Sequence, residues 1–427
     1  MKIAIAGYGV EGEANYTYFS KDAANEITIV DQKDVPDRPL PEGVATLLSP
    51  NAFEQLNGFD VVVRTAGLAP RKIVTDGKIW SSTNEFFSKC PAPIIGVTGS
   101  KGKGTTSSLI ASILKKAGYT VWLVGNIGQP PLDLLDQIKA DHIVVFELSS
   151  FQLWDIERSP HTAVVLFIEP DHLDVHADMA EYVAAKGNIT AYQTTDDILI
   201  YNAENEYSRS IAESSSAQKV AYPSELTTHI KDGYFYNGEQ KICSVDAVTL
   251  PGAHNLSNAI AAIDAIWAYT QDNDVIAAGL SAFRGLPHRL AFVATVSGVN
   301  YYDDSIATTP TSAVAALRAF DSSKVIILGG SSKGSDFTTL AEELTRHDVK
   351  ALLIGEEANR IAEACRQAGF THFEIIENPT MEKVVNRAHE IAIEGSVVLL
   401  SPSAASFGLF KNYADRGEQF IAAVNSL

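Results

Sequence analysis

The chain has 427 residues, 20% of them charged and 46% hydrophobic, a composition typical of a soluble globular protein with about two to four domains. The net charge of −19 argues against non-specific nucleic-acid binding, so polyanionic ligands must be met by local cations and Mg²⁺. We expect a cytoplasmic protein without membrane insertion, because no apolar run reaches spanning length, no leader precedes the first strand, and Cys90, Cys243 and Cys365 form no disulfide or metal pattern.

The first segment predicts a strand that runs into a glycine turn. The opening KIAIAGYGVEG places Gly7, Gly9 and Gly12 in the G-x-G-x-x-G spacing at the end of an apolar run. The next predicted strand, EITIVD, ends at Asp31, about the offset at which an acidic residue meets a ribose hydroxyl in a Rossmann unit. We therefore expect residues 1–90 to form a Rossmann-like domain.

Residues 94–106, IIGVTGSKGKGTT, have the pattern of a phosphate cradle. Glycines let backbone N–H groups approach phosphate oxygens, and Lys103 and the N-terminus of the following helix supply positive charge. Gly104 follows the lysine, so a magnesium-holding hydroxyl must come from Thr105 or Thr106. The segment predicts a nucleoside triphosphate site, and the alternative is an ordinary glycine-rich strand-to-helix turn.

Several later apolar runs are typical of parallel strands covered on both faces. They lie at 119–125, 142–148, 162–168 and 197–202, and are followed by a hairpin signal at 234–240 and an alanine-rich helix at 252–270. Further strands at 324–330, 350–356 and 396–403 predict a second Rossmann-like sheet. We therefore expect an α/β protein with three domains, covering 1–90, 91–287 and 288–427: a Rossmann-like domain, a P-loop ATPase-type parallel sheet and a C-terminal Rossmann-like domain.

Polar side chains follow two of the central strands. Glu147 stands at the end of one, and Asp171 and His172 come a few residues after another. Because ligands of open α/β sheets bind at the carboxyl edge, these groups are candidates to hold phosphate-bound Mg²⁺. The alternatives are an edge carboxylate without function and a structural histidine.

The order of the motifs along the whole chain resembles the Mur ligase family. They are the cradle, GNIG (125–128), ELSSFQL (147–153), DHLD (171–174), AAK (184–186), GAHNLSN (252–258), GLPHR (285–289), DDSIAT (303–308), GGSSKGSDF (329–337) and LLSPSAASFGLFKNYADRG (399–417). The cradle, DHLD and GLPHR are shared across the family. ELSSFQL and the terminal segment indicate the branch that adds glutamate to UDP-N-acetylmuramoyl-L-alanine.

The resemblance implies an ATP-dependent ligase of peptidoglycan synthesis. ATP phosphorylates the substrate carboxylate and the amino group of glutamate attacks the acyl phosphate, so catalysis is positioning and charge neutralisation. Lys103 is expected to hold the transferred phosphate, and Glu147, His172 and Thr105 to hold Mg²⁺, with two ions in all. Lys186 matches the position that the family carbamylates with CO₂ to support the metal. From the residues alone, Lys186 is an ordinary surface lysine on a helix.

The resemblance also distributes substrate contacts over the three domains. The UDP substrate is expected at Gly7, Gly9, Val10, Glu11, Asp31, Asn126, Ser149 and Gln152. ATP is expected at Gly99, Ser100, Lys101, Gly102, Lys103, Gly104, Thr105, Thr106, Asn255, Asn258, Arg289 and Asp304. Glutamate is expected at Thr308, Lys333, Ser406 and Tyr413, where a cation and hydroxyls meet carboxylates. All ligands are small molecules, none is a nucleic acid, and we expect a monomer.

Three positions depart from the family pattern. Gly104 resembles the cradle of folylpolyglutamate synthase, Ile306 replaces a lysine expected near the phosphates, and Phe167 stands where asparagine is common. The alternatives are a folylpolyglutamate-synthase-like ligase and a weakly active or non-catalytic nucleotide-binding protein of the same family. An NAD-dependent oxidoreductase would use the first glycine turn but leaves the second cradle unexplained.

Overall fold

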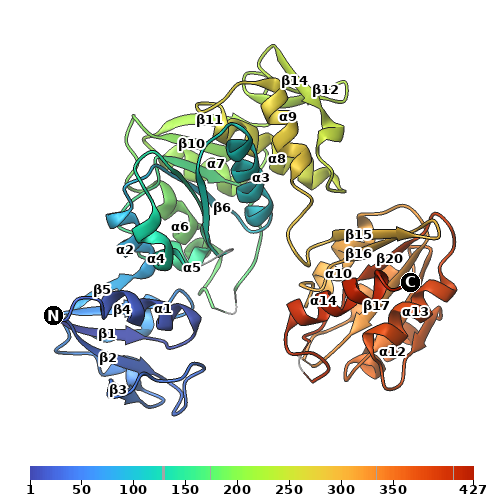
Figure 1. Ribbon diagram of the computed structural model, residues 1–427, viewed down its shortest axis with the longest axis horizontal. Coiled ribbons are helices and arrows are strands. Elements are labelled where there is room, and N and C mark those ends of the chain that lie inside the picture. The colour runs from blue at the N-terminus through green and yellow to red at the C-terminus, as the bar shows by residue number, and fades with distance from the viewer. Residues whose placement is uncertain (127–129, 174, 333, 407) are drawn as a thin grey trace. The chain divides into compact units, whose positions relative to one another are not determined.

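The computed structural model describes residues 1–427 apart from 127–129, 174, 333 and 407. It divides into two compact units. The first comprises Met1–Thr249 and His254–Phe283, and the second comprises Leu250–Ala253 and Arg284–Leu427. Among the described residues, the first unit holds three sheets and the second holds one (Figure 1).

A five-stranded parallel sheet with the order β3-β2-β1-β4-β5 begins the first unit. Its elements are β1 (Lys2–Ala6), α1 (Val10–Phe19), β2 (Glu26–Asp31), β3 (Ala45–Leu48), β4 (Val61–Arg64), β5 (Lys78–Ser81) and α2 (Ser82–Lys89). Alternate residues of β1 face opposite sides, so that Ile3 and Ile5 enter one core and Ala4 and Ala6 another. The Rossmann-like arrangement that the glycine turn predicted is present.

The central sheet is also parallel, with the order β11-β10-β9-β6-β8-β7. Its strands are β6 (Ile94–Thr98), β7 (Val121–Gly125), β8 (Ile143–Glu147), β9 (Thr162–Val165), β10 (Ile198–Asn202) and β11 (Gln218–Tyr222). The connecting helices are α3 (Lys103–Lys116), α4 (Pro131–Leu134), α5 (Ser150–Leu153), α6 (Met179–Gly187) and α7 (Glu206–Ser214). Because β6 lies between β8 and β9, the loops that follow these three strands meet at one edge of the sheet.

A small antiparallel sheet and two helices complete this unit. The sheet consists of β12 (Thr228–Lys231), β13 (Tyr234–Asn237) and β14 (Gln240–Ser244), and the helices are α8 (Ala253–Ile266) and α9 (Asn273–Ala282). Helix α9 packs closely on α3, since a Cβ at Gly279 would lie 2.5 Å from Cα of Ile113. The predicted hairpin and the predicted alanine-rich helix are both present.

The second unit holds a six-stranded sheet with the order β15-β16-β20-β17-β18-β19, parallel except for β15. Its strands are β15 (Ala291–Val296), β16 (Val299–Asp303), β17 (Lys324–Gly329), β18 (Val349–Ile354), β19 (Phe373–Ile375) and β20 (Val397–Leu400). Its helices are α10 (Pro310–Arg318), α11 (Thr338–Leu344), α12 (Ala358–Gln367), α13 (Met381–Ile391) and α14 (Tyr413–Val424). Cores lie on both faces of the sheet: Ile326 and Leu328 enter one, and Val325 and Ile327 the other.

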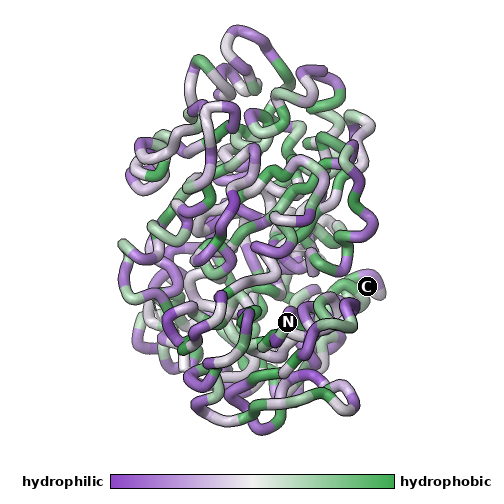
Figure 2. The backbone as a smooth tube through the Cα atoms, turned by 90° about the vertical axis from the view of Figure 1, so that its left-hand side faces the viewer, coloured by the Kyte–Doolittle hydropathy of each residue, from purple (hydrophilic) through white to green (hydrophobic). Residues whose placement is uncertain are grey.

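The α/β fold predicted from the apolar runs is confirmed. Every strand predicted in the central and C-terminal blocks is present. The strands β3, β5, β11, β12, β15, β16 and β19 were not predicted, because their segments are short and carry no long apolar run. Figure 2 shows that short hydrophobic and hydrophilic stretches alternate along the whole backbone. In the part of the chain that the structure describes, none of the helices has the length and apolar character needed to cross a membrane.

Candidate functional site

The glycine turn after β6 has the backbone conformation that a phosphate cradle requires. Gly99 and Gly102 have φ of 151° and 86°, in the region that favours glycine. A Cβ at Gly102 would lie 2.3 Å from Oδ1 of Asn258, so α8 packs directly on the turn. Gly102 also begins α3 without a side-chain cap, which leaves the first N–H groups of the helix available to an anion.

Two lysines converge on one carbonyl oxygen in this turn. Nζ of Lys103 donates to the oxygen of Gly99 at 3.0 Å, and Nζ of Lys186, from α6, donates to the same oxygen at 2.8 Å. Lys103 also donates to the oxygen of Ser100 at 2.9 Å. The structure thus brings together the two lysines that the sequence assigned to catalysis.

Lys186 is buried, with 1% of its surface exposed, so the interpretation of this residue as a surface lysine is wrong. Its ammonium lies over the ring of Tyr182, 4.6 Å from the centroid. Burial and the neighbouring Lys103 hold the pKa of Lys186 well below its usual value. The lowered pKa makes the neutral amine, the form that reacts with CO₂, easier to reach than in an exposed lysine.

Glu147 ends β8 beside the cradle strand and is 4% exposed. Its Oε1 accepts a hydrogen bond from Nδ2 of Asn126 at 3.2 Å, while its Oε2 is buried without a hydrogen-bond partner among the described residues. The hydroxyl oxygen of Thr106 is also buried without a hydrogen-bond partner among the described residues. Buried carboxylate and hydroxyl oxygens without partners fit a hard cation such as Mg²⁺, because leaving them unpaired is costly.

His172 lies at the surface rather than in the core. Its φ of 54° is left-handed, its side chain is 47% exposed, and its ring packs 4.9 Å from that of Phe151. The described residues contain no group of three or more His, Cys, Asp and Glu side chains placed to hold a metal. The assignment of His172 to the metal therefore stays a prediction, and Asp174 of the DHLD motif lies outside the described residues.

Four of the residues assigned to the UDP substrate line one cavity of about 240 Å³ in the first unit. They are Val10, Glu11, Asn126 and Gln152. Glu11 is fixed by a backbone hydrogen bond from Ala66 at 2.8 Å and by the hydroxyl of Ser82 at 2.6 Å. Asn126 also donates to Glu147, so one residue of the cavity wall contacts the candidate metal carboxylate.

The remaining residues of this set, Gly7, Gly9, Asp31 and Ser149, are not among the described residues that line this cavity. Asp31 accepts hydrogen bonds from the backbone of Tyr8 at 2.7 Å and of Lys33 at 2.9 Å, which holds the first glycine turn in place. Within that turn, Gly7 has a φ of 90° and Gly9 begins α1 without a side-chain cap. Ser149 forms a capping box with Gln152 at the start of α5.

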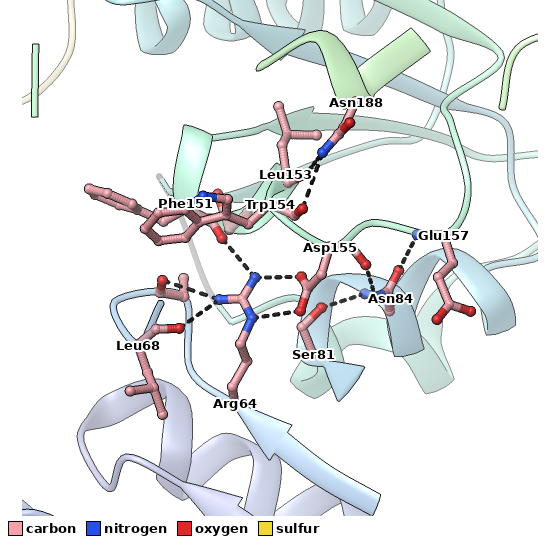
Figure 3. Close-up of polar contacts among 12 residues, drawn as sticks. Arg64, Leu68, Ser81, Asn84, Phe151, Leu153, Trp154, Asp155, Glu157 and Asn188 are labelled. Carbon is pink, nitrogen blue, oxygen red and sulfur yellow. Dashed lines mark hydrogen bonds and ion pairs between the residues drawn. The ribbon is translucent and has the colours of Figure 1, made fainter. Parts of the chain in front are cut away.

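Arg64, which the sequence analysis did not single out, joins the first sheet to the segment after Glu147 (Figure 3). It is fully buried, and its Nε and Nη2 donate to the two carboxylate oxygens of Asp155, the contact from Nε being 2.7 Å. It also donates to the oxygen of Phe151 at 2.9 Å and of Leu68 at 3.2 Å. An arginine at the end of an apolar strand was the only sequence signal for this contact.

In the second unit, three of the four residues assigned to glutamate, Thr308, Ser406 and Tyr413, follow strands β16 and β20 at the carboxyl edge of the sheet. Ser406 is buried, Thr308 is half-buried, and Tyr413 is partly exposed at the start of α14. Lys333 lies outside the described residues. Of the ATP residues assigned to this unit, Arg289 is exposed, whereas Asp304 is buried and accepts hydrogen bonds from Ser401 at 2.7 Å and from the backbone of Leu290 at 3.1 Å.

A buried polar network in this unit was also missed. Nδ1 of His288 lies 2.6 Å from Asp303, and a Cβ at Gly417 would lie 2.1 Å from the same nitrogen. Arg416 is fully buried and donates to Oγ of Ser305 at 2.9 Å, and burial lowers its pKa to about 10. The motifs GLPHR, DDSIAT and ADRG contain these residues, so the signal for the network was present in the sequence.

Two family models match the chain. One, described as the Mur ligase middle domain, matches residues 97–266, and the other, described as the Mur ligase, glutamate ligase domain, matches residues 288–404. The first covers the cradle and Lys186, and the second covers the Lys333 loop.

Two relatives that align over nearly their whole length carry the same name. The chain is 36% identical to the UDP-N-acetylmuramoylalanine--D-glutamate ligase of Clostridium tetani, an alignment that covers 100% of this chain and 97% of the relative. It is 34% identical to the enzyme of the same name from Clostridium novyi, with the same coverage.

Solved structures share the fold at lower identity. The chain resembles the UDP-N-acetylmuramate-alanine ligase MurC of Thermotoga maritima with a TM-score of 0.60 at 18% identity, covering 100% of this chain and 99% of that one. It resembles the folylpolyglutamate synthase of Mycobacterium tuberculosis with a TM-score of 0.59 at 16% identity, covering 80% of this chain and 93% of that one.

Proposed function

Because this chain belongs to the Mur ligase family, we propose that it joins the amino group of D-glutamate to the carboxylate of UDP-N-acetylmuramoylalanine. The protein is an ATP-dependent amide ligase of peptidoglycan synthesis. The γ-phosphoryl group of ATP passes to the substrate carboxylate, and ADP leaves. The glutamate nitrogen then attacks the acyl carbon, phosphate leaves, and the nitrogen loses its proton.

The observation that carries the proposal is the meeting of Lys103, Lys186 and Glu147 around the cradle. Lys103 and the uncapped start of α3 supply the positive charge that the transferred phosphoryl group needs. Neither half of the reaction needs an enzyme nucleophile, so a site made of cations, backbone N–H groups and metal-binding oxygens is sufficient.

We propose that Glu147, a cradle threonine and Lys186 hold magnesium. The unpartnered Oε2 of Glu147 and the unpartnered hydroxyl of Thr106 support this assignment, with Thr105 as the neighbouring alternative. Carbamylation joins the Lys186 nitrogen to the carbon of CO₂ with loss of a proton, which replaces a poorly solvated amine by an anionic oxygen donor. Magnesium when bound neutralises the negative charge of the phosphates. We also propose that His172 is a metal ligand and that the site holds a second magnesium ion.

We propose a binding place for each of the three organic ligands from the residues assigned to them. The cavity lined by Glu11, Asn126 and Gln152 would hold the UDP substrate with its carboxylate toward Glu147. Lys333, Ser406 and Thr308 would bind the two carboxylates of glutamate, because such a ligand needs two separate sets of donors. Asn255, Asn258, Arg289 and Asp304 would contact ATP.

The test measures phosphate release from ATP as the substrates are added one at a time. Release should require both UDP-N-acetylmuramoylalanine and D-glutamate, and L-glutamate should not replace the D isomer. Gly104 resembles the cradle of folylpolyglutamate synthase, so a ligase activity of that kind is the second candidate. A parallel reaction therefore contains a reduced folate and L-glutamate. Release in that reaction alone, or in neither, would refute the proposal.

A further inference from the structure

Asn188 joins the end of α6 to the end of α5 (Figure 3). Its Nδ2 donates to the backbone oxygens of Leu153 and Trp154, at 3.0 and 3.1 Å. The last carbonyl groups of a helix have no partner within the helix, so this one amide satisfies two of them at the end of α5. The backbone N–H of Asn188 in turn caps α6, by donating to the oxygens of Ala184 and Lys186. One residue therefore caps both helices.

The two helices that Asn188 caps are next to the two sides of the candidate metal site. Lys186 belongs to α6 and stands two residues before Asn188. Glu147 ends β8, and α5 begins at Ser150 after two further residues. Because Lys186 and Glu147 come from segments far apart in the chain, the separation of their side chains depends on how α5 and α6 are held together.

The hydrogen bond from Lys186 to Gly99 does not by itself fix this separation once the lysine is carbamylated. An ammonium offers three N–H donors and a positive charge, whereas a carbamate nitrogen keeps one N–H and carries a negative carboxylate group. Hydrogen bonds from a charged donor are the stronger ones, so the contact with the oxygen of Gly99, at 2.8 Å, is weakened. The end of α6 then depends on anchors away from the reacting nitrogen, and Asn188 is such an anchor.

A second asparagine holds the same segment from a different element. Nδ2 of Asn84, on α2, donates to the oxygen of Asp155 at 2.8 Å, and its Oδ1 accepts from the backbone N–H of Glu157 at 2.7 Å (Figure 3). Asn84 and Asn188 thus each form two hydrogen bonds with the backbone of residues 153–157. They differ in the helix that they join to this segment, which makes Asn84 a matched control.

We propose that Asn188 is a positioning residue for the magnesium site. By tying the end of α6 to the end of α5, it sets the separation between the carbamylated nitrogen of Lys186 and the carboxylate of Glu147. Groups that orient metal ligands without touching the metal commonly change metal affinity by about 10- to 100-fold. The inference rests on the proposed function, since it takes Lys186 and Glu147 as magnesium ligands, and it adds a residue that the motifs do not assign.

The test compares Asn188→Ala and Asn188→Asp with Asn84→Ala in the full chain. Asn188→Asp keeps the size of the side chain but removes both N–H donors. In ¹³C-labelled bicarbonate and Mg²⁺, the carbamate carbon signal should be weaker than in the wild type for both Asn188 variants, because a misplaced carbamate is less stabilised by the ion that Glu147 shares. Asn84→Ala should keep the wild-type signal. The Mg²⁺ concentration for half-maximal phosphate release should rise about 10-fold or more in the Asn188 variants only.

A thermal unfolding measurement separates positioning from a purely structural role. Asn84 is 1% exposed and Asn188 is half-buried, so Asn84→Ala should lower the unfolding temperature at least as much as Asn188→Ala. An equal loss of the carbamate signal in Asn84→Ala, or a wild-type signal and Mg²⁺ requirement in the Asn188 variants, would overturn the inference. A wild type without the carbamate signal would overturn it as well. Failure of the proposed function has a different signature: the wild type would release no phosphate with UDP-N-acetylmuramoylalanine and D-glutamate, whatever its carbamate signal.

Discussion

Lys103 and Lys186 donate to the same carbonyl oxygen, that of Gly99, at 3.0 and 2.8 Å. Two ammonium groups so close repel each other, and the buried one gives up its proton more readily. The cradle therefore holds two lysines in different environments, Lys103 at the start of α3 and Lys186, which is buried and has a lowered pKa. These two environments suit two different tasks, phosphate neutralisation and carbamate formation.

Lys103→Ala should lower the rate of ligation by about 10²-fold or more, because removing one charge contact in a transition state costs about 3 kcal/mol. Steady-state phosphate release measures the effect. Lys116→Ala, at the exposed end of the same helix, is the matched control and should retain wild-type turnover. Near-normal turnover of Lys103→Ala would remove this lysine from the cradle assignment.

Lys186→Ala should be nearly inactive, and acetate or formate should restore part of the activity by replacing the carbamate oxygens. Wild-type protein in ¹³C-labelled bicarbonate should show a carbamate carbon signal by NMR that Lys186→Ala lacks. Lys139→Ala, which changes an exposed lysine, should retain both the signal and the activity. Full activity of Lys186→Ala would show that the carbamate is not needed.

Arg64→Met should destabilise the first unit by about 3 kcal/mol, because it leaves Asp155 and several carbonyl groups without their buried donor (Figure 3). Lys78→Met breaks an exposed pair with Glu157, at 2.8 Å, and should cost less than about 1 kcal/mol. Denaturant unfolding compares the two variants. Equal losses would mean that the buried pair adds no more stability than the exposed one.

Asp264→Asn should change how stability depends on pH. Burial raises the pKa of Asp264 to about 7, against hydrogen bonds from Thr228 that lower it. The folded chain therefore keeps a proton that the unfolded chain loses near pH 4, and the stability from that proton disappears as the pH rises to about 7. The melting temperature of the variant relative to the wild type should thus rise from pH 4 to pH 7. Asp246→Asn, at an exposed position, should show no such trend.

Lys333→Ala should raise the KM for glutamate by about 10- to 150-fold and leave the KM values for ATP and the UDP substrate nearly unchanged. Loss of a charge-assisted hydrogen bond to one ligand has an effect of this size. Lys350→Ala, an exposed lysine of the same unit, serves as the control. Weaker ATP binding with unchanged glutamate binding would reassign Lys333 to the phosphates, in place of the lysine missing at Ile306.

Much of the site could be predicted from local patterns. Apolar runs identified β6, β8 and β9, and their order placed the cradle and Glu147 at one sheet edge, because parallel strands end on the same side. The order of the motifs identified Lys186 as the candidate for carbamylation. The sequence of its helix by itself predicted an ordinary surface lysine. The short strands with mixed exposure were not predictable, since a half-exposed strand of a few residues has no distinct period.

The sequence by itself predicted the fold class and a phosphate cradle, because these depend on residues close together in the chain. It also identified the family, because the family's motifs occur in a fixed order along the whole chain. Only the tertiary structure decided that Lys186 is buried against Gly99, that Arg64 pairs with Asp155, and that Glu11 lines the same cavity as Asn126 and Gln152. Each of these contacts joins segments tens of residues apart or depends on what other elements cover. Burial and the pKa values that follow from it are properties of packing, and a linear pattern does not contain them.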